Sequence, residues 1–181
     1  GWALSMLFVP AMWLLVDAVG GLRARHSAAV AVGTHEFHDY AVLVPIYGNI
    51  KYLENVEYLG RYGHRVVLCT TTGESREFNA AIVGISRRHG FRIFRATADN
   101  SSTAGRKRAT GGTVRDTVIK AVLPTVDARY VVCIDADTTT TQPLERLVGA
   151  LHARGLDVAS IRLVPSNAHE SLLTRFQAHE Y

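Results

Sequence analysis

The stretch YAVLVPIYGNIKYLENVEYLGRYGHRVVLCTTTG, residues 40–73, decides the predicted fold. Its apolar runs at 41–46 and 65–70 are short and bounded by glycine or polar residues, which is typical of buried strands. Residues 49–63 between them predict a helix that begins after Asn49 and ends at Gly63. A strand, a helix and a second strand together form the repeating unit of α/β proteins with parallel sheets.

The same alternation continues along the rest of the chain. Further strands are predicted at 91–96, 129–134 and 157–162. Further helices are predicted at 76–90, 114–124, 144–155 and 168–181. Their beginnings carry residues that favour helix starts, namely Ser75, the pair Thr113 and Asp116, Pro143, and the pair Asn167 and Glu170. From Tyr40 onward the sequence therefore predicts one α/β domain with a mostly parallel sheet flanked by helices.

The N-terminal residues 1–22 are almost entirely apolar, and Asp17 is the one charged residue among them. Their length approaches the roughly 20 residues that a helix needs to cross a bilayer. Arg23 and Arg25 follow directly, and this placement predicts a cytoplasmic domain anchored in the inner or plasma membrane. A signal peptide and a buried core helix are the alternatives, but residues 23–39 have the polar composition of a linker.

The overall charge of the chain indicates an anionic binding partner but does not identify which kind. The chain has 181 residues, a net charge of +4 and an isoelectric point near 9.3. That charge suits nucleic acid, anionic lipid or a phosphorylated small molecule, but no nucleic-acid-binding module is recognisable. Cys69 and Cys133 lie in apolar runs, so we expect two buried free thiols and a reducing compartment. The first residue is Gly1, and we interpret the sequence as a piece of a longer protein.

Polar or aromatic residues follow three of the predicted strands. They occupy the segments Pro45–Tyr47, Thr70–Glu74 and Asp135–Asp137. Ligands of open parallel sheets bind outside the carboxyl ends of the strands, so we expect these three segments to line one crevice.

The segment YVVCIDADTTTT, residues 130–141, ends its strand with two carboxylates one residue apart. Acids at strand ends are also ordinary turn formers, so the pair has a purely structural alternative. The chemical alternative is a divalent cation: one or two carboxylates suit Mg²⁺ or Mn²⁺ when water and phosphate fill the other positions. Lys107 and Arg108 lie in a cationic loop, residues 98–112, which is either an anion site before a helix or a solvated surface loop.

Three segments, VLVPIYG, CTTTGES and CIDADTTTTQPLERLVGAL, resemble family 2 glycosyltransferases of the GT-A fold. The resemblance covers roughly residues 40–163. With the apolar N-terminus it is similar to the membrane-anchored processive polysaccharide synthases, such as hyaluronan and cellulose synthases. It implies transfer of a sugar from a nucleotide diphosphate sugar, such as a uridine diphosphate sugar, to a growing glycan or other acceptor. On this interpretation residues 40–181 are the N-terminal, nucleotide-sugar-binding part of the transferase domain.

The resemblance also implies roles for individual residues. The donor nucleotide sugar would contact seven of them, which are Pro45, Tyr47, Thr71, Glu74, Lys107, Arg108 and Asp135. Asp137, together with Asp135, would hold Mg²⁺ or Mn²⁺ at the diphosphate.

Two departures from the family pattern carry consequences. The family has an acid just after the second strand, whereas here Thr70, Thr71 and Thr72 stand first and Glu74 follows. The family's acidic general base and its Gln-x-x-Arg-Trp motif are absent, and on this resemblance they would lie beyond Tyr181. The fragment would then bind the donor without transferring sugar. A non-catalytic nucleotide-binding or regulatory domain on the same fold is the alternative function.

Overall fold

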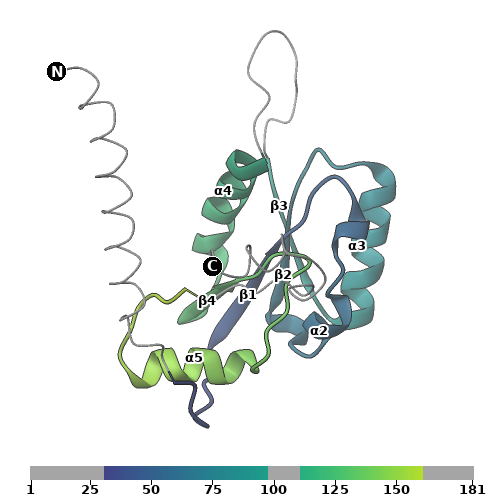
Figure 1. Cartoon of the computed structure of the whole chain (residues 1–181). Helices are drawn as coiled ribbons and strands as arrows, with labels where there is room; N and C mark the ends of the chain where they lie inside the picture. The colour runs from purple at the N-terminus through teal and green to yellow at the C-terminus, as the bar shows by residue number, and fades with distance from the viewer. Residues whose placement is uncertain (1–30, 98–110, 161–181) are drawn as a thin grey trace, which may run out of the picture. The chain divides into compact units, whose positions relative to one another are not determined.

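The computed structural model describes residues 31–97 and 111–160, without the side chains of residues 111 and 113 (Figure 1). Its sheet has four strands, all parallel, in the order β3-β2-β1-β4. The strands are β1 (Tyr40–Pro45), β2 (Val66–Thr71), β3 (Arg92–Ala96) and β4 (Tyr130–Cys133). The helices are α2 (Val56–Gly60), α3 (Arg76–His89), α4 (Gly111–Val122) and α5 (Leu144–Ala153). Single 3₁₀ turns occupy Ile50–Tyr52, Gly63–Arg65 and Leu123–Thr125. The prediction of an α/β domain with helices flanking a parallel sheet is confirmed, and the arrangement is consistent with a Rossmann-like fold.

Helices cover both faces of the sheet because successive side chains of a strand point to opposite faces. Val42, Val44 and Leu68 pack with the buried residues of α2, α3 and α5 in the larger core. Leu43 and Cys69 point to the other face, where they pack against α4 in the smaller core. Figure 1 shows α4 apart from α2 and α3, on the opposite side of the sheet.

The four predicted strands between residues 41 and 134 are confirmed to within one residue at each end, but the strand at 157–162 is wrong over its described part. Residues 157–160 form no strand. Gly155 ends the turn after α5 with a φ of +63°, and Val158 beyond it is 84% exposed. Without burial, the apolar residues that predicted this strand have nothing to pack against.

The continuous helix predicted at 49–63 is also wrong, because the segment is broken into a 3₁₀ turn and the short helix α2. The backbone N–H groups of Glu54 and Asn55 donate to the carbonyl of Ala136, at 2.9 and 3.3 Å, instead of to a preceding helical turn. A tertiary contact thus replaces the local hydrogen bonds that would have continued the helix.

The other helices differ from prediction mainly at their ends. The α3 helix begins after Ser75, whose hydroxyl accepts from the N–H of Phe78 at 3.1 Å, and ends at Gly90 in the left-handed region. The α4 helix begins at Gly111, two residues before the predicted cap Thr113, and Pro143 precedes α5 as its N-cap residue.

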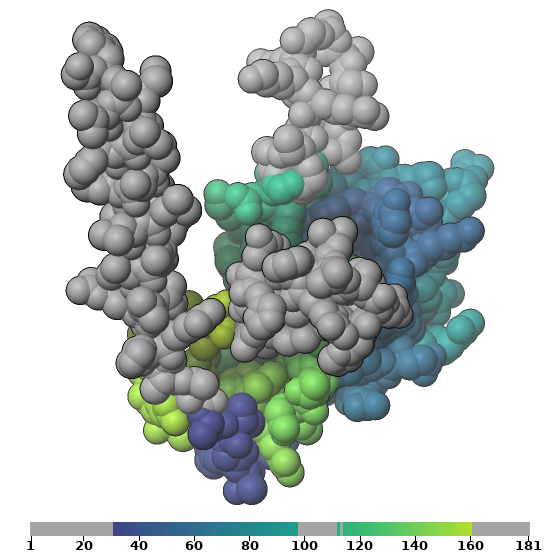
Figure 2. All heavy atoms as spheres, viewed as in Figure 1, coloured from purple at the N-terminus to yellow at the C-terminus, as the bar shows by residue number. Residues whose placement is uncertain are grey.

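A short strap, residues 34–39, lies at the end of the predicted linker 23–39 and packs on α5. The N–H of Phe37 donates to the carbonyl of Glu145 at 3.0 Å. The Phe37 ring lies 4.0 Å from the His152 ring and 5.5 Å from the Tyr130 ring, centroid to centroid. In Figure 2 the purple strap lies against the yellow-green residues of α5. The strap is therefore part of the domain surface.

No helix within residues 31–97 and 111–160 combines the length and the apolar character that a membrane span requires. The membrane helix predicted at 1–22, the cationic pair Lys107 and Arg108, and the helix predicted at 168–181 lie outside the described residues.

Candidate functional site

The candidate site lies at the carboxyl ends of β1 and β4, where two acidic side chains follow the sheet. The chain runs outward from β1 through β2 to β3, and then returns through α4 to place β4 on the other side of β1. The strand order therefore places the carboxyl ends of β1 and β4 side by side, and open α/β sheets bind ligands in the crevice outside such neighbouring ends. Leu43 pairs with Cys133 in the sheet, and the N–H of Ile134 still donates to the carbonyl of Leu43 at 3.0 Å. The two acids follow directly after this last contact.

The loop that carries the acids, residues 134–138, alternates between buried and solvent-facing side chains. Ile134 and Ala136 are buried in the larger core, at 3% and 8% exposure, whereas Asp137 is exposed and Asp135 is half-buried. The N–H of Thr138 donates to the carbonyl of Asp135 at 3.0 Å and closes a turn. The loop is therefore anchored by its apolar residues while both carboxylates remain at the surface.

Asn55 holds this loop from the other side of the crevice. Its side-chain amide donates to the carbonyl oxygen of Asp135 at 3.1 Å and also to that of Thr138. The residue is 5% exposed, and its own Oδ1 is buried without a partner among the described residues. Together with the two backbone bonds to Ala136, Asn55 makes the shape of the acidic loop depend on the segment that precedes α2.

Arg115 of α4 forms an ion pair with the first acid. Its Nη1 lies 2.8 Å from Oδ1 of Asp135, and the two side chains are 43% and 47% exposed. Asp137 has a weaker contact, from the hydroxyl of Thr138 at 3.3 Å. One carboxylate is thus neutralised by a guanidinium, and the second faces solvent.

Glu74 joins the ends of β1 and β2. Its carboxylate accepts from the N–H of Gly48 at 2.8 Å and from the hydroxyl of Thr71 at 2.8 Å. Gly48 has a φ of +71°, which only glycine adopts without strain, so the loop after β1 turns sharply to meet the carboxylate. Glu74 therefore fixes the β1 loop, and Thr71, which is fully buried, contributes through Glu74.

Tyr47 lies between these groups. Its hydroxyl is buried and has no hydrogen-bond partner among the described residues. The pKa of Tyr47 is raised to about 12, chiefly by burial and also by Cys69 and the carboxylates of Glu74 and Asp135, against the lowering effect of Arg115. A buried polar group without a partner costs free energy, so a hydrogen-bonding ligand at this position would be favoured.

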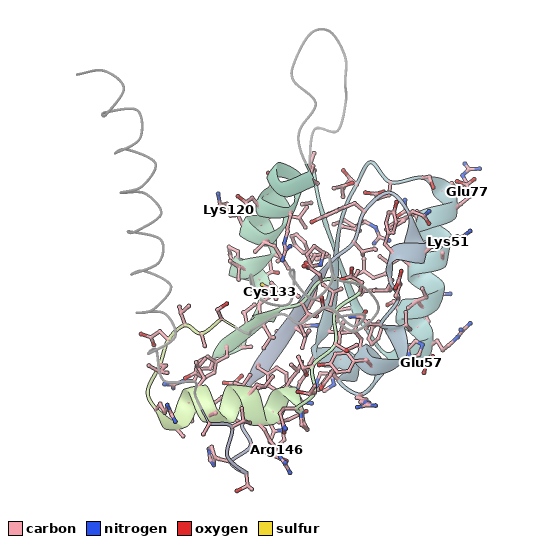
Figure 3. All side chains as sticks on the ribbon, viewed as in Figure 1. Lys51, Glu57, Glu77, Lys120, Cys133 and Arg146 are labelled. Atoms are coloured by element: carbon pink, nitrogen blue, oxygen red, sulfur yellow. The ribbon has the colours of Figure 1, made fainter. Side chains whose placement is uncertain are left out.

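Cys133 pairs with Leu43, whose side chain packs against α4, and its thiol lies on the α4 side of β4 (Figure 3). It is free and exposed, whereas Cys69 is free and buried, so the expectation of two buried thiols is wrong for Cys133. Partial desolvation of its sulfur raises the pKa of Cys133, while nearby Arg115 lowers it. The pKa of the Cys133 thiol therefore depends on the charges of Arg115 and Asp135.

The donor groups at this edge fit Mg²⁺ or Mn²⁺. Within the described residues no three acidic, histidine or cysteine side chains converge, so a cation there would be held by two carboxylates and by oxygen atoms of a ligand or water. Magnesium sites that carry phosphates have this composition. Asp137 is exposed and available, and the ion pair with Arg115 uses only Oδ1 of Asp135, so its second carboxylate oxygen lies outside that pair.

The predicted site residues divide into three groups. Tyr47, Glu74, Asp135 and Asp137 belong to the ends of β1, β2 and β4 around the crevice. Pro45 and Thr71 belong to the same strand ends but are buried, and Lys107 and Arg108 lie outside the described residues. Arg115 and Asn55 were missed. Neither gave a local signal in the sequence, because Arg115, in the second turn of α4, and Asn55, before α2, reach the acidic loop only through tertiary packing.

A hollow of about 190 Å³ lies beyond the acidic loop, between α2 and the start of α5. It is lined by Tyr58, Arg61, Thr140 and Gln142 among others, and the Tyr58 hydroxyl lies 2.7 Å from that of Thr140. Neither Asp135 nor Asp137 lines this hollow.

Comparison of the chain with protein-family models, with characterised proteins and with solved structures gave no match.

Proposed function

We propose that this chain binds a nucleoside diphosphate sugar together with Mg²⁺ or Mn²⁺, as the donor-binding part of a glycosyltransferase with the GT-A form of the α/β fold. The observation that carries the proposal is the position of Asp135 and Asp137 directly after β4, at the crevice beside β1. Diphosphates and divalent cations bind together where carboxylates meet the carboxyl edge of a parallel sheet.

Each described residue has a separate part in this proposal. Asp137 is exposed and offers its carboxylate to the cation, and Asp135 offers a second oxygen from the same loop. The ring of Tyr47 and the β1 loop fixed by Glu74 form the side of the crevice toward β2. We assign the nucleoside to this side. Lys107 and Arg108 remain proposed phosphate contacts.

The reaction proposed for the transferase is displacement at the anomeric carbon of the donor sugar. The acceptor hydroxyl oxygen forms the new bond, and the bond from that carbon to the diphosphate oxygen breaks, with its electron pair leaving on the diphosphate. The acceptor proton passes to a general base, a role that we assign to none of the described residues. When bound, the cation neutralises the charge that develops on the departing diphosphate.

Calorimetric titration with a uridine diphosphate sugar, with and without Mn²⁺, tests the proposal. We expect binding only in the presence of the metal, because bare carboxylates repel a diphosphate. Asp137→Asn should weaken binding by at least about tenfold, since it removes a charged ligand. Asp127→Asn is the matched control, because Asp127 is an exposed acid before the opposite end of β4.

Equal affinity in the wild type with and without metal, or no binding by a folded wild type, rejects the site. An equal loss for Asp127→Asn and Asp137→Asn would show that total charge, and not this loop, determines affinity.

The membrane position is a separate part of the proposal and rests on the sequence of residues 1–22 and on Arg23 and Arg25. We expect the protein to stay with membranes through an alkaline wash and to need detergent for extraction. Release by the alkaline wash would exclude a spanning anchor.

A further inference from the structure

The ion pair between Arg115 and Asp135 places an organic cation at the position where the proposed metal would bind. The pair is close, at 2.8 Å, but neither side chain is enclosed, since almost half of each is exposed to solvent. It occupies only one oxygen of Asp135, and Asp137 has no cationic partner among the described residues. Such an exposed pair is weak enough to be exchanged, because surface ion pairs contribute little net free energy.

The charges around the ends of β1 and β4 show why Arg115 would leave Asp135 when a metal ion binds. Asp135, Asp137 and Glu74 carry three negative charges, and Arg115 is the described cation that acts on both Asp135 and the Tyr47 hydroxyl. A divalent cation at the two aspartates would bring a positive charge close to the guanidinium, and like charges disfavour one another. A diphosphate on that cation would in turn bring negative oxygens within reach of α4.

Arginine is suited to such a move. Its guanidinium presents several N–H donors in a planar fork that matches phosphate as well as carboxylate oxygens. The side chain of Arg115 is long and partly solvated, and its backbone is held in α4. The guanidinium can therefore change partner while its helix stays in place.

We propose that Arg115 is a charge-exchange residue, which neutralises Asp135 when the crevice is empty and turns to the phosphate oxygens when the metal and a nucleoside diphosphate bind. This inference rests on the proposed function and adds a second step to it. In the empty crevice Arg115 opposes metal binding, and in the loaded crevice it holds the diphosphate.

The two roles predict changes of opposite sign for one substitution. Arg115→Gln should bind Mn²⁺ alone more tightly, by about threefold or more, because a competing positive charge is removed. The same variant should bind uridine diphosphate in saturating Mn²⁺ more weakly, by about tenfold or more, because a charge-assisted hydrogen bond is lost. Arg115→Lys keeps the charge and loses the fork, so it should resemble the wild type toward Mn²⁺ and fall between the two proteins toward the nucleotide.

Lys120→Gln is the matched control, since Lys120 is an exposed cation of the same helix and points away from the crevice (Figure 3). It lowers the net charge by the same amount, and we expect both affinities to stay within about twofold of the wild type. Both titrations are done by calorimetry on the 181-residue chain, after thermal melting has shown that each variant is folded.

A parallel loss of both affinities in Arg115→Gln would mean that the arginine only shapes the loop, and this would overturn the exchange. Unchanged Mn²⁺ affinity, or equal effects in Lys120→Gln, would overturn it as well. In these cases the wild type still binds metal and nucleotide, and the proposed function stands. A folded wild type that binds neither would reject the proposed function and the exchange together.

Discussion

Gly149 of α5 lies directly against the backbone of His35: a β-carbon at position 149 would overlap the His35 carbonyl oxygen and come within 2.9 Å of its carbonyl carbon. The absence of a side chain on one turn of α5 therefore lets the strap cross the helix at close range. Glu36 and Phe37, the next two residues, contact α5 through an ion pair of 3.7 Å to Arg146 and a backbone hydrogen bond.

Gly149→Ala should therefore destabilise the domain, although alanine favours helices. We expect a loss of about 1–3 kcal/mol, because the overlap with backbone atoms forces the strap or the helix to move. Gly84→Ala in α3 is the control, since a β-carbon there would meet nothing within 4 Å. It should raise the free energy of unfolding by up to about 1 kcal/mol through helix propensity. Urea unfolding of both variants measures the difference. Equal stability of the two would contradict the close crossing.

Substitution of Asn55 should affect both stability and the acidic loop. Asn55→Ala removes the side-chain donor to the Thr138 carbonyl and one of the two donors to the Asp135 carbonyl, which should cost about 1–3 kcal/mol. Asn55→Asp should cost more, because a buried carboxylate would face the same two carbonyls. Both variants should also bind Mn²⁺ more weakly, since the loop loses its shape.

Asn79→Ala is the matched control for that experiment. Asn79 also donates to two carbonyls, those of Glu74 and Ser75 at 2.9 Å, but at the start of α3 and in a less buried position. We expect a smaller loss of stability and unchanged Mn²⁺ affinity. If Asn55→Ala left both quantities at the wild-type values, Asn55 would not support the loop.

The two thiols should react at very different rates in the folded protein. Cys133 is exposed and Cys69 is completely buried, so iodoacetamide should modify Cys133 alone, with a rate that rises with pH as the thiolate forms. Mn²⁺ with uridine diphosphate should slow the reaction, because the ligand would lie beside the end of β4. Peptide mass spectrometry identifies the modified residue. Equal modification of Cys69 in the native protein, or no protection of Cys133 by the ligand, would contradict this placement.

The domain should lose stability at alkaline pH. Burial raises the pKa of Cys69 to about 12 from 9.0, and that of Tyr47 to about 12 from 10.0. Because both folded-state values are raised, their contribution is complete below the unfolded values and is lost as pH rises toward about 12. Urea unfolding from about pH 8 to about pH 11 should show a plateau and then a steady fall. Tyr47→Phe should give a shallower fall above about pH 10, and an unchanged slope would contradict the assignment.

Local patterns were enough to predict the strands β1 to β4, because each is a short apolar run between polar boundaries. The start of α3 was equally clear, since Ser75 caps it by a bond to a residue three positions away. The acidic pair could be placed at the sheet edge for the same reason. The break between Tyr52 and Val56 could not be predicted, because the hydrogen-bond acceptor that replaces the helical one is the carbonyl of Ala136.

The partner of Asp135 was missed for a related reason. Twenty residues separate it from Arg115 in the chain, and the pairing depends on how α4 packs against the sheet. Composition suggested cations only in the loop before α4. The strand predicted at 157–162 shows the opposite error, since an apolar pattern predicted burial that residues 157–160 do not have.

The long-range bonds to the acidic loop and to α5 have a consequence for the order of folding. The bond from Asn55 to Asp135 joins residues 80 positions apart, and the bond from Tyr40 to Glu145 joins residues 105 positions apart. The strands β1, β2 and β3, by contrast, pair with their neighbours in sequence order. During synthesis on the ribosome these three strands can associate while residues 130–145 are still unmade. We therefore expect the acidic loop to form last, against a surface that has already folded, because the closure of long-range contacts is slow.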